Sequence, residues 1–69
     1  MEFKAVVSSN IQGVHYEPAT EVMTVEFKNG GRYAYKGVPA DEHEGLMNAA
    51  SCGQYLNENI KGTYPHTRV

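Results

Sequence analysis

The sequence has little cysteine, no long apolar run and no excess of positive charge. Cys52 is the only cysteine, so an intramolecular disulfide and a zinc site built from several thiolates are both excluded, and this usage suits the reducing cytosol. No apolar stretch approaches the roughly 20 residues of a membrane-spanning helix, and the first residues do not resemble a signal peptide. We therefore expect a cytoplasmic protein with no membrane segment.

Charge and length narrow the class of protein further. Six Lys and Arg residues face eight Asp and Glu residues, which gives a net charge of −2. Proteins dedicated to nucleic acids usually carry a basic excess, because neutralising phosphates drives their affinity. A chain of 69 residues forms one domain and buries only about 60% of the surface of its unfolded form. We expect a thin core in which one sheet face is covered by one or two helices.

The first two-thirds of the chain shows the alternation of apolar and polar residues that is typical of half-buried strands. Val14 and Tyr16 lie in a strand of about five residues, and a turn around Pro18 follows. The two strands of a hairpin are then marked by Met23, Val25 and Phe27 and by Tyr33 and Tyr35, while residues 3–7 form an edge strand. This pattern predicts an antiparallel meander of three to four strands.

The last third is helical in pattern. Pro39 suits a first helical turn, and acidic residues at 41, 42 and 44 stabilise a helix start. An apolar face at 43, 46, 47 and 50 continues that helix, and Ser51 is placed to cap a second, short helix over 54–61 that Gly62 ends. Strands followed by helices predict an α+β fold, with one longer and one short helix packed on one sheet face. Residues 65–69 are expected to form a flexible tail.

Two registers of the hairpin place the tyrosines differently, because a shift of one residue turns every side chain to the other face. A loop of three residues starting at Asn29 pairs Phe27 with Tyr33 and puts Tyr33 and Tyr35 in the core. A loop of two residues exposes both rings between Arg32 and Lys36. Consistent sorting of apolar and polar residues favours the three-residue loop, and the exposed pair remains the alternative.

No constellation of residues indicates catalysis or metal binding. His15, His43 and His66 lie in different predicted elements without the i, i+4 spacing of a helical metal site. Cys52 is interpreted as a small buried packing residue, and the acids near residue 42 as helix-stabilising charges. We expect no enzymatic activity, no metal and no cofactor.

An ordered set of short motifs resembles the KTSC domain, a family named after the C-terminal domain of some lysyl-tRNA synthetases and also found as free-standing small bacterial proteins. The motifs are Ser8-Ser9-Asn10-Ile11, Val14-x-Tyr16, Gly31-x-Tyr33-x-Tyr35, Val38-Pro39, Ala49-x-Ser51-x-Gly53 and Tyr55-x-Asn57. The similarity runs from about Val6 to Tyr64, so residues 1–64 are expected to form one such domain. Leu56 stands where the family often has an aromatic residue. The resemblance implies no catalytic residues, and the association with a synthetase suggests RNA binding.

Two functions remain open at this stage. The first is binding of RNA, tRNA or a nucleotide, in which tyrosines stack on bases and cations contact phosphates. The residues expected to bind are Arg32, Tyr33, Tyr35, Lys36, Ser51, Gly53 and Lys61. The alternative is a protein-interaction module that binds a protein partner or a second copy of itself through a sheet edge or an apolar patch.

Overall fold

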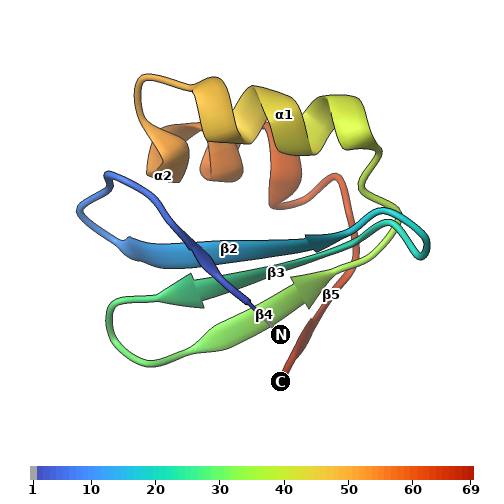
Figure 1. Ribbon diagram of the computed structural model, residues 1–69, viewed down its shortest axis with the longest axis horizontal. Coiled ribbons are helices and arrows are strands. Elements are labelled where there is room, and N and C mark those ends of the chain that lie inside the picture. The colour runs from blue at the N-terminus through green and yellow to red at the C-terminus, as the bar shows by residue number, and fades with distance from the viewer. Residues whose placement is uncertain (1) are drawn as a thin grey trace.

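A computed structural model describes residues 2–69 and shows two layers, a sheet and a helical layer that covers one of its faces (Figure 1). The sheet is antiparallel, has the strand order β1-β2-β3-β4-β5 and confirms the predicted α+β meander. The elements are β1 (Lys4–Ala5), β2 (Ile11–Glu17), β3 (Val22–Phe27), β4 (Arg32–Tyr35), α1 (Ala40–Asn48), α2 (Cys52–Tyr55), the π-helix η1 (Leu56–Ile60) and β5 (His66–Arg68).

Strand β2 is longer than its alternating pattern predicts. It begins at Ile11, which is fully buried, and the register against β3 shifts between Ile11 and Gly13. Such a bulge inserts an extra residue and interrupts the period of two on which the prediction depends. The predicted edge strand at residues 3–7 is present as the short β1, paired with β2.

The β3–β4 hairpin has a three-residue loop, but the loop is Lys28–Gly30, one residue earlier than predicted. Gly30 adopts a φ of 95°, and the amide of Phe27 donates to the carbonyl of Gly31 across 2.8 Å. Tyr33 therefore pairs with Val25 and not with Phe27. Tyr33 thus pairs with a residue two positions earlier on β3 than predicted. Because side chains alternate with a period of two along a strand, both tyrosines still lie on the sheet face that the three-residue loop predicts. Tyr35 is 1% exposed and Tyr33 is half-buried.

The short helix predicted over 54–61 begins two residues earlier and changes its form. The hydroxyl of Ser51 accepts from the amide of Gln54 at 3.3 Å, which is the predicted cap. The α-helical turn runs directly into η1, where the amide of Lys61 donates to the carbonyl of Leu56 over five residues. Gly62, with a φ of 82°, ends the helix as predicted.

Residues 65–69, expected to form a flexible tail, instead contain the fifth strand of the sheet. Figure 1 shows β5 running along the free edge of β4. Backbone hydrogen bonds from Lys36 to Pro65 and from Val69 to Arg32, each 2.9 Å long, flank the pairing. All three residues of β5 are exposed, so no apolar alternation marks this strand in the sequence.

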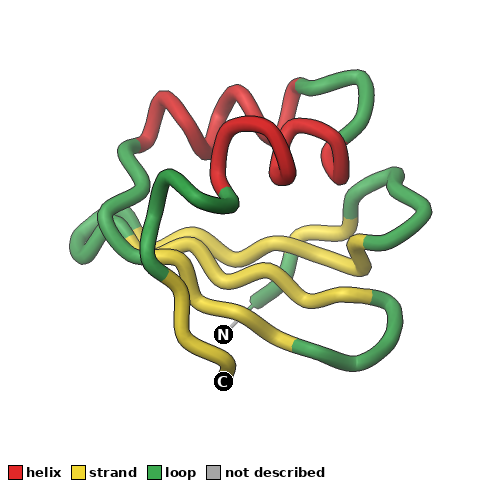
Figure 2. Tube along the Cα trace, turned by 180° about the vertical axis from the view of Figure 1, so that it is seen from behind, coloured by secondary structure: helices red, strands yellow, loops and turns green. Residues whose placement is uncertain are grey.

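Figure 2 shows the sheet and the helical layer from behind, and the core is formed by side chains from these two layers. Its ten buried apolar residues are Ile11, Val14, Met23, Val25, Tyr35, Val38, Leu46, Cys52, Leu56 and Ile60. Cys52 is a buried packing residue, and its thiol donates to the carbonyl of Leu46 at 3.3 Å. This core holds the helical layer over the sheet and fixes the position of η1 beside the end of β3.

Candidate functional site

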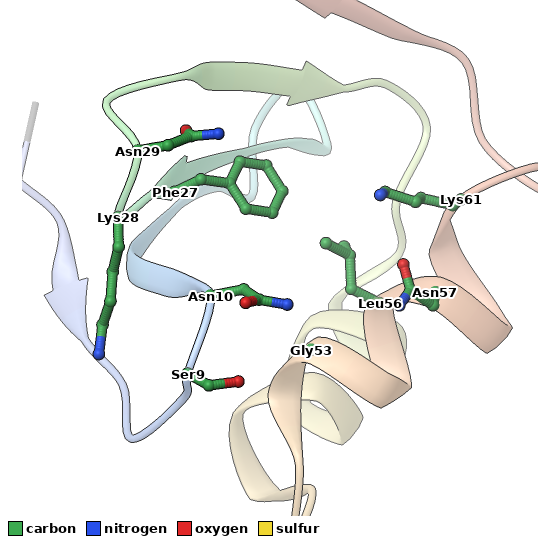
Figure 3. Close-up of a pocket in the computed structure, with 9 residues that line it drawn as sticks. All are labelled: Ser9, Asn10, Phe27, Lys28, Asn29, Gly53, Leu56, Asn57 and Lys61. Carbon is green, nitrogen blue, oxygen red and sulfur yellow. The ribbon is translucent and has the colours of Figure 1, made fainter.

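A groove opens where the end of β3 faces η1. We call it the amide groove; it has a volume of about 550 Å³ and is lined by Ser9, Asn10, Phe27, Lys28, Asn29, Gly53, Leu56, Asn57 and Lys61. Figure 3 shows the ring of Phe27 in its centre, with the amide side chains of Asn10 and Asn29 on either side of the ring. Leu56, Asn57 and Lys61 face the ring from η1 and the residue that follows it.

Local hydrogen bonds hold the walls of the amide groove in place. The hydroxyl of Ser8 accepts from the amides of Asn10 and Ile11 at 3.2 Å, so the polar segment before β2 forms a turn. The backbone carbonyl of Asn10 accepts from the amide of Lys28 at 2.8 Å and ties this turn to the β3–β4 hairpin. The side-chain oxygen of Asn29 accepts from the amide of Gly31 at 3.0 Å. The side-chain NH₂ group of Asn29 thus remains a donor at the rim.

A second hollow adjoins the groove, and we call it the tyrosine hollow. Its volume is about 460 Å³ and its lining residues are Phe27, Asn29, Tyr33, Tyr35, Lys61 and His66. The ring of Tyr33 meets those of Phe27 and His66 edge to face, at centroid distances of 5.7 and 5.6 Å. The ring of Tyr35 lies 5.4 Å from that of His66. Aromatic rings from three strands therefore form one wall.

The tyrosine hydroxyls of the domain fall into two groups. Tyr16 donates to the carbonyl of Val38 at 2.7 Å. Tyr55 and Tyr64 both donate to the carboxylate of Glu42, which joins α2 and the turn after η1 to α1. Within residues 2–69, no hydrogen-bond partner is found for the hydroxyl of Tyr33 or Tyr35, the two tyrosines that line the hollow. Burial, and next the neighbouring Tyr33, raise the pKa of Tyr35 above its ordinary value. The phenol therefore stays protonated near neutral pH and is available as a donor.

The charge at the two hollows is opposite to the net charge of the chain. Lys61 lines both hollows, and its ammonium group lies 5.9 Å from the centroid of the Phe27 ring. Lys28 lies at the rim of the amide groove with its ammonium group turned away from the ring (Figure 3). Of the acidic side chains that the structure describes, none lines either hollow. The charged side chains that line the hollows in the described chain are therefore lysines, although the protein as a whole is acidic.

The structure brings together four of the seven residues that the sequence indicated for binding. Tyr33, Tyr35 and Lys61 line the tyrosine hollow, and Gly53 lines the amide groove together with Lys61. The other three lie elsewhere, and none of them lines either hollow. Arg32 forms an ion pair with Glu26 at 2.8 Å and lies over the ring of Phe3, 5.0 Å from its centroid.

Lys36 is exposed and directly follows the end of β4, and Ser51 caps α2 beside a separate shallow hollow. Eight further lining residues are not among those expected to bind: Ser9, Asn10, Phe27, Lys28, Asn29, Leu56, Asn57 and His66. The sequence pattern predicts Phe27 as a core residue and His66 as part of a tail, because apolar alternation shows neither which core positions lie at an opening nor a strand without apolar residues.

The described residues also bear on metal binding and membrane insertion. Between residues 2 and 69, no group of three His, Cys, Asp or Glu side chains is arranged to hold a metal ion. His43 stacks on Tyr16 with ring centroids 4.4 Å apart, and the ring nitrogen Nδ1 of His15 lies 2.8 Å from the carbonyl of Glu2. No helix in the described chain has the length and apolar character needed to cross a membrane.

Comparison with known proteins identifies the domain type. The family model of the KTSC domain matches residues 7–64. The crystal structure of a KTSC domain protein from Yersinia pestis superposes with a TM-score of 0.95 at 31% identity, covering 99% of this chain and 96% of that one. An uncharacterized protein of Stutzerimonas stutzeri is 33% identical over 88% of this chain and 86% of its own length.

A lysine–tRNA ligase of Nostoc sp. is 41% identical over 88% of this chain, and the chain spans only 11% of that ligase. The KTSC domain is not a known catalytic domain, and it occurs both within such ligases and in free-standing small proteins. The matched range covers most of the sequence and includes every element from β2 to η1. This chain therefore belongs to the KTSC domain family.

Proposed function

We propose that the chain is a non-catalytic module that binds single-stranded RNA or a nucleotide in the amide groove and the tyrosine hollow. The observation that carries this proposal is the composition of the two hollows: aromatic rings, amide and phenol donors and a shared lysine, with no acidic lining residue among those the structure describes. A ligand that suits this surface has flat rings, many hydrogen-bond acceptors and negative charge. Nucleotides combine all three properties.

Each part of a nucleotide has a matching group. The ammonium group of Lys61 is placed to contact a phosphate, and amides such as Asn10 and Asn57 can bond the edge of an unpaired base. The half-buried rings of Phe27 and Tyr33 offer surfaces for stacking, which is tolerant of base identity. The match to proteins named lysine–tRNA ligase supports RNA as the nucleic acid.

The affinity of such a site is modest and depends on salt. Among the described residues, Lys28 and Lys61 are the lysines that line the hollows, and Lys28 lies at the rim, so at most about two phosphates are neutralised. The logarithm of the binding constant for a single strand then falls with the logarithm of the salt concentration with a slope of about −1.4. This small slope is compatible with a protein whose net charge is −2.

A fluorescence anisotropy titration with short labelled RNA at several salt concentrations tests the proposal. Lys61→Gln should weaken binding at low salt and reduce the slope by about 0.7. Lys36→Gln is the matched control, because it removes the same charge from an exposed residue outside both hollows. If both variants lose affinity equally, the ligand follows the Arg32 to Lys36 strand instead and the proposed surface is wrong.

Protein interaction is the competing function and has its own readout. The outer edge of β5 is unpaired in the five-stranded sheet and all its residues are exposed, which is the geometry that strand addition uses. Sedimentation of the same samples shows whether the chain self-associates. Absence of RNA binding at every salt concentration, together with a dimer in sedimentation, would reject the RNA proposal in favour of self-association.

A further inference from the structure

The amide groove and the tyrosine hollow meet at a common border. Phe27, Asn29 and Lys61 line both. From this border the groove extends to Asn10 and Asn57, while the hollow extends to Tyr33 and His66. The ammonium group of Lys61 points toward the Phe27 ring (Figure 3), and both of these residues line both spaces. A flexible ligand can therefore occupy both spaces at once around one positive charge.

Each space is large enough for a separate group. Their volumes of about 550 and 460 Å³ both exceed the roughly 300 Å³ at which small-molecule sites begin. Their chemistry is also different. The groove offers amide groups that both donate and accept, whereas the hollow offers rings and the hydroxyls of Tyr33 and Tyr35. Two neighbouring bases of one strand would each find hydrogen-bonding groups and an aromatic surface.

We infer that the unit recognised by this domain is a dinucleotide step of a single strand. One base lies in the amide groove, the next lies in the tyrosine hollow, and the phosphate that links them contacts the ammonium group of Lys61. This inference rests on the proposed function and adds the length and the placement of the ligand. Its physical basis is that two linked groups bind more tightly than either alone, because the second binding event is intramolecular.

Two base sites and a site for phosphate alone predict opposite preferences between a mononucleotide and a dinucleotide. A mononucleoside monophosphate carries a charge near −2 at pH 7, whereas the linking phosphate of a dinucleoside monophosphate carries a single charge. A site that recognised only phosphate would prefer the mononucleotide. Two base sites around one cation should instead bind the dinucleotide about tenfold more tightly or better, since stacking of one added base alone accounts for such a factor.

The experiment is titration calorimetry with UpU, ApA, UMP and AMP as probes, run beside a longer RNA. Asn57→Ala changes only the groove, and Tyr33→Phe keeps the ring but removes a hydroxyl from the hollow. Each variant should weaken dinucleotide binding about fivefold or more. Lys36→Gln, on an exposed residue outside both spaces, should leave it unchanged.

The outcomes separate this inference from the proposed function. If UMP or AMP binds as tightly as its dinucleotide, or if only one of the two variants weakens the dinucleotide, the two-base arrangement is wrong. Binding of the longer RNA that still depends on Lys61 would then leave the proposed function standing. If neither the dinucleotides nor the longer RNA bind, both proposals fail.

Discussion

Tyr35 offers the sharpest test of the fold, because its ring and its hydroxyl serve different purposes. The ring is 1% exposed on β4, between β3 and β5, and belongs to the core. Replacing the ring by alanine removes about 150 Å² of buried apolar surface, which at about 25 cal/mol per Å² corresponds to a loss of about 4 kcal/mol in the free energy of unfolding. This agrees with the roughly 3–5 kcal/mol measured for removing large aromatic side chains from cores.

That loss is large for a domain of this size. A chain of 69 residues has a free energy of unfolding of about 3–10 kcal/mol, and each kcal/mol shifts the Tm of such a domain by about 4–8 °C. Tyr35→Ala should therefore lower the Tm by about 15–30 °C and move the urea midpoint accordingly. A shift below about 4 °C would refute the placement of Tyr35 in the core and revive the exposed tyrosine pair.

Tyr35→Phe is the matched control, because it keeps the ring and removes only the hydroxyl. No protein partner of that hydroxyl is found within the described residues, so the Tm should change by less than the equivalent of about 1 kcal/mol. If the tyrosine hollow binds RNA, the same variant should weaken RNA about fivefold, the effect of one hydrogen bond of about 1 kcal/mol. An RNA affinity equal to that of the wild type would show that the hydroxyl is not part of the site.

Three further predictions concern other parts of the fold. Phe27→Ala should cost about 1–3 kcal/mol in a urea titration, less than for a fully buried ring, because Phe27 is half-buried at the border of the two hollows; a loss as large as that of Tyr35→Ala would contradict this. Gly45→Ala should lower the free energy of unfolding by about 1–3 kcal/mol, because the Cβ of the new alanine would overlap the hydroxyl of Tyr55, and this clash outweighs the better helix propensity of alanine. A higher Tm for this variant would show that Tyr55 can move aside. Burial, and next the positive charge of Lys4, lower the pKa of His43 below 6.5, while Glu44 acts in the opposite direction, so the stability that His43 contributes is present above pH 6.5 and is lost as the pH falls through the folded-state pKa. His43→Phe can still stack on Tyr16 but cannot be protonated, so this variant should lose less stability than the wild type in urea titrations between pH 7.5 and 5.5. An equal loss in both proteins would assign the pH dependence to other groups.

The positions of the cations add information about a ligand that the net charge does not contain. A net charge of −2 argued against tight, non-specific binding of nucleic acid, and it left the location of any basic patch open. In the structure, Arg32 is paired with Glu26, whereas Lys61 lies at a concave surface without acidic lining residues in the described chain. Charge counts therefore bound the affinity, and only the positions of the charges suggest a ligand.

In the helical layer, residue type was sufficient to predict where the second helix is capped and where it ends, but not its π-helical form. Ser51 and Gly62 act within their own segment, one through a hydrogen bond to Gln54 and the other through a positive φ, so both helix limits could be anticipated from residue type. The π-helical form of η1 could not be anticipated, because it depends on how Leu56 and Ile60 are packed in the core. Lys61 directly follows η1, and its ammonium group lies 5.9 Å from the centroid of the Phe27 ring.

The sequence by itself determined the class of fold, the inward face of β3 and β4, and the helix start and stop signals, because each of these depends on residue type and a short repeat. The bulge in β2, the fifth strand and the candidate site were decided only by the tertiary structure. β5 has no apolar pattern and exists through backbone pairing with β4, a contact between segments some 30 residues apart. The two hollows likewise combine residues from the turn before β2, the β3–β4 hairpin, η1 and β5. Such surfaces arise from contacts between distant segments, which no local period in a sequence records.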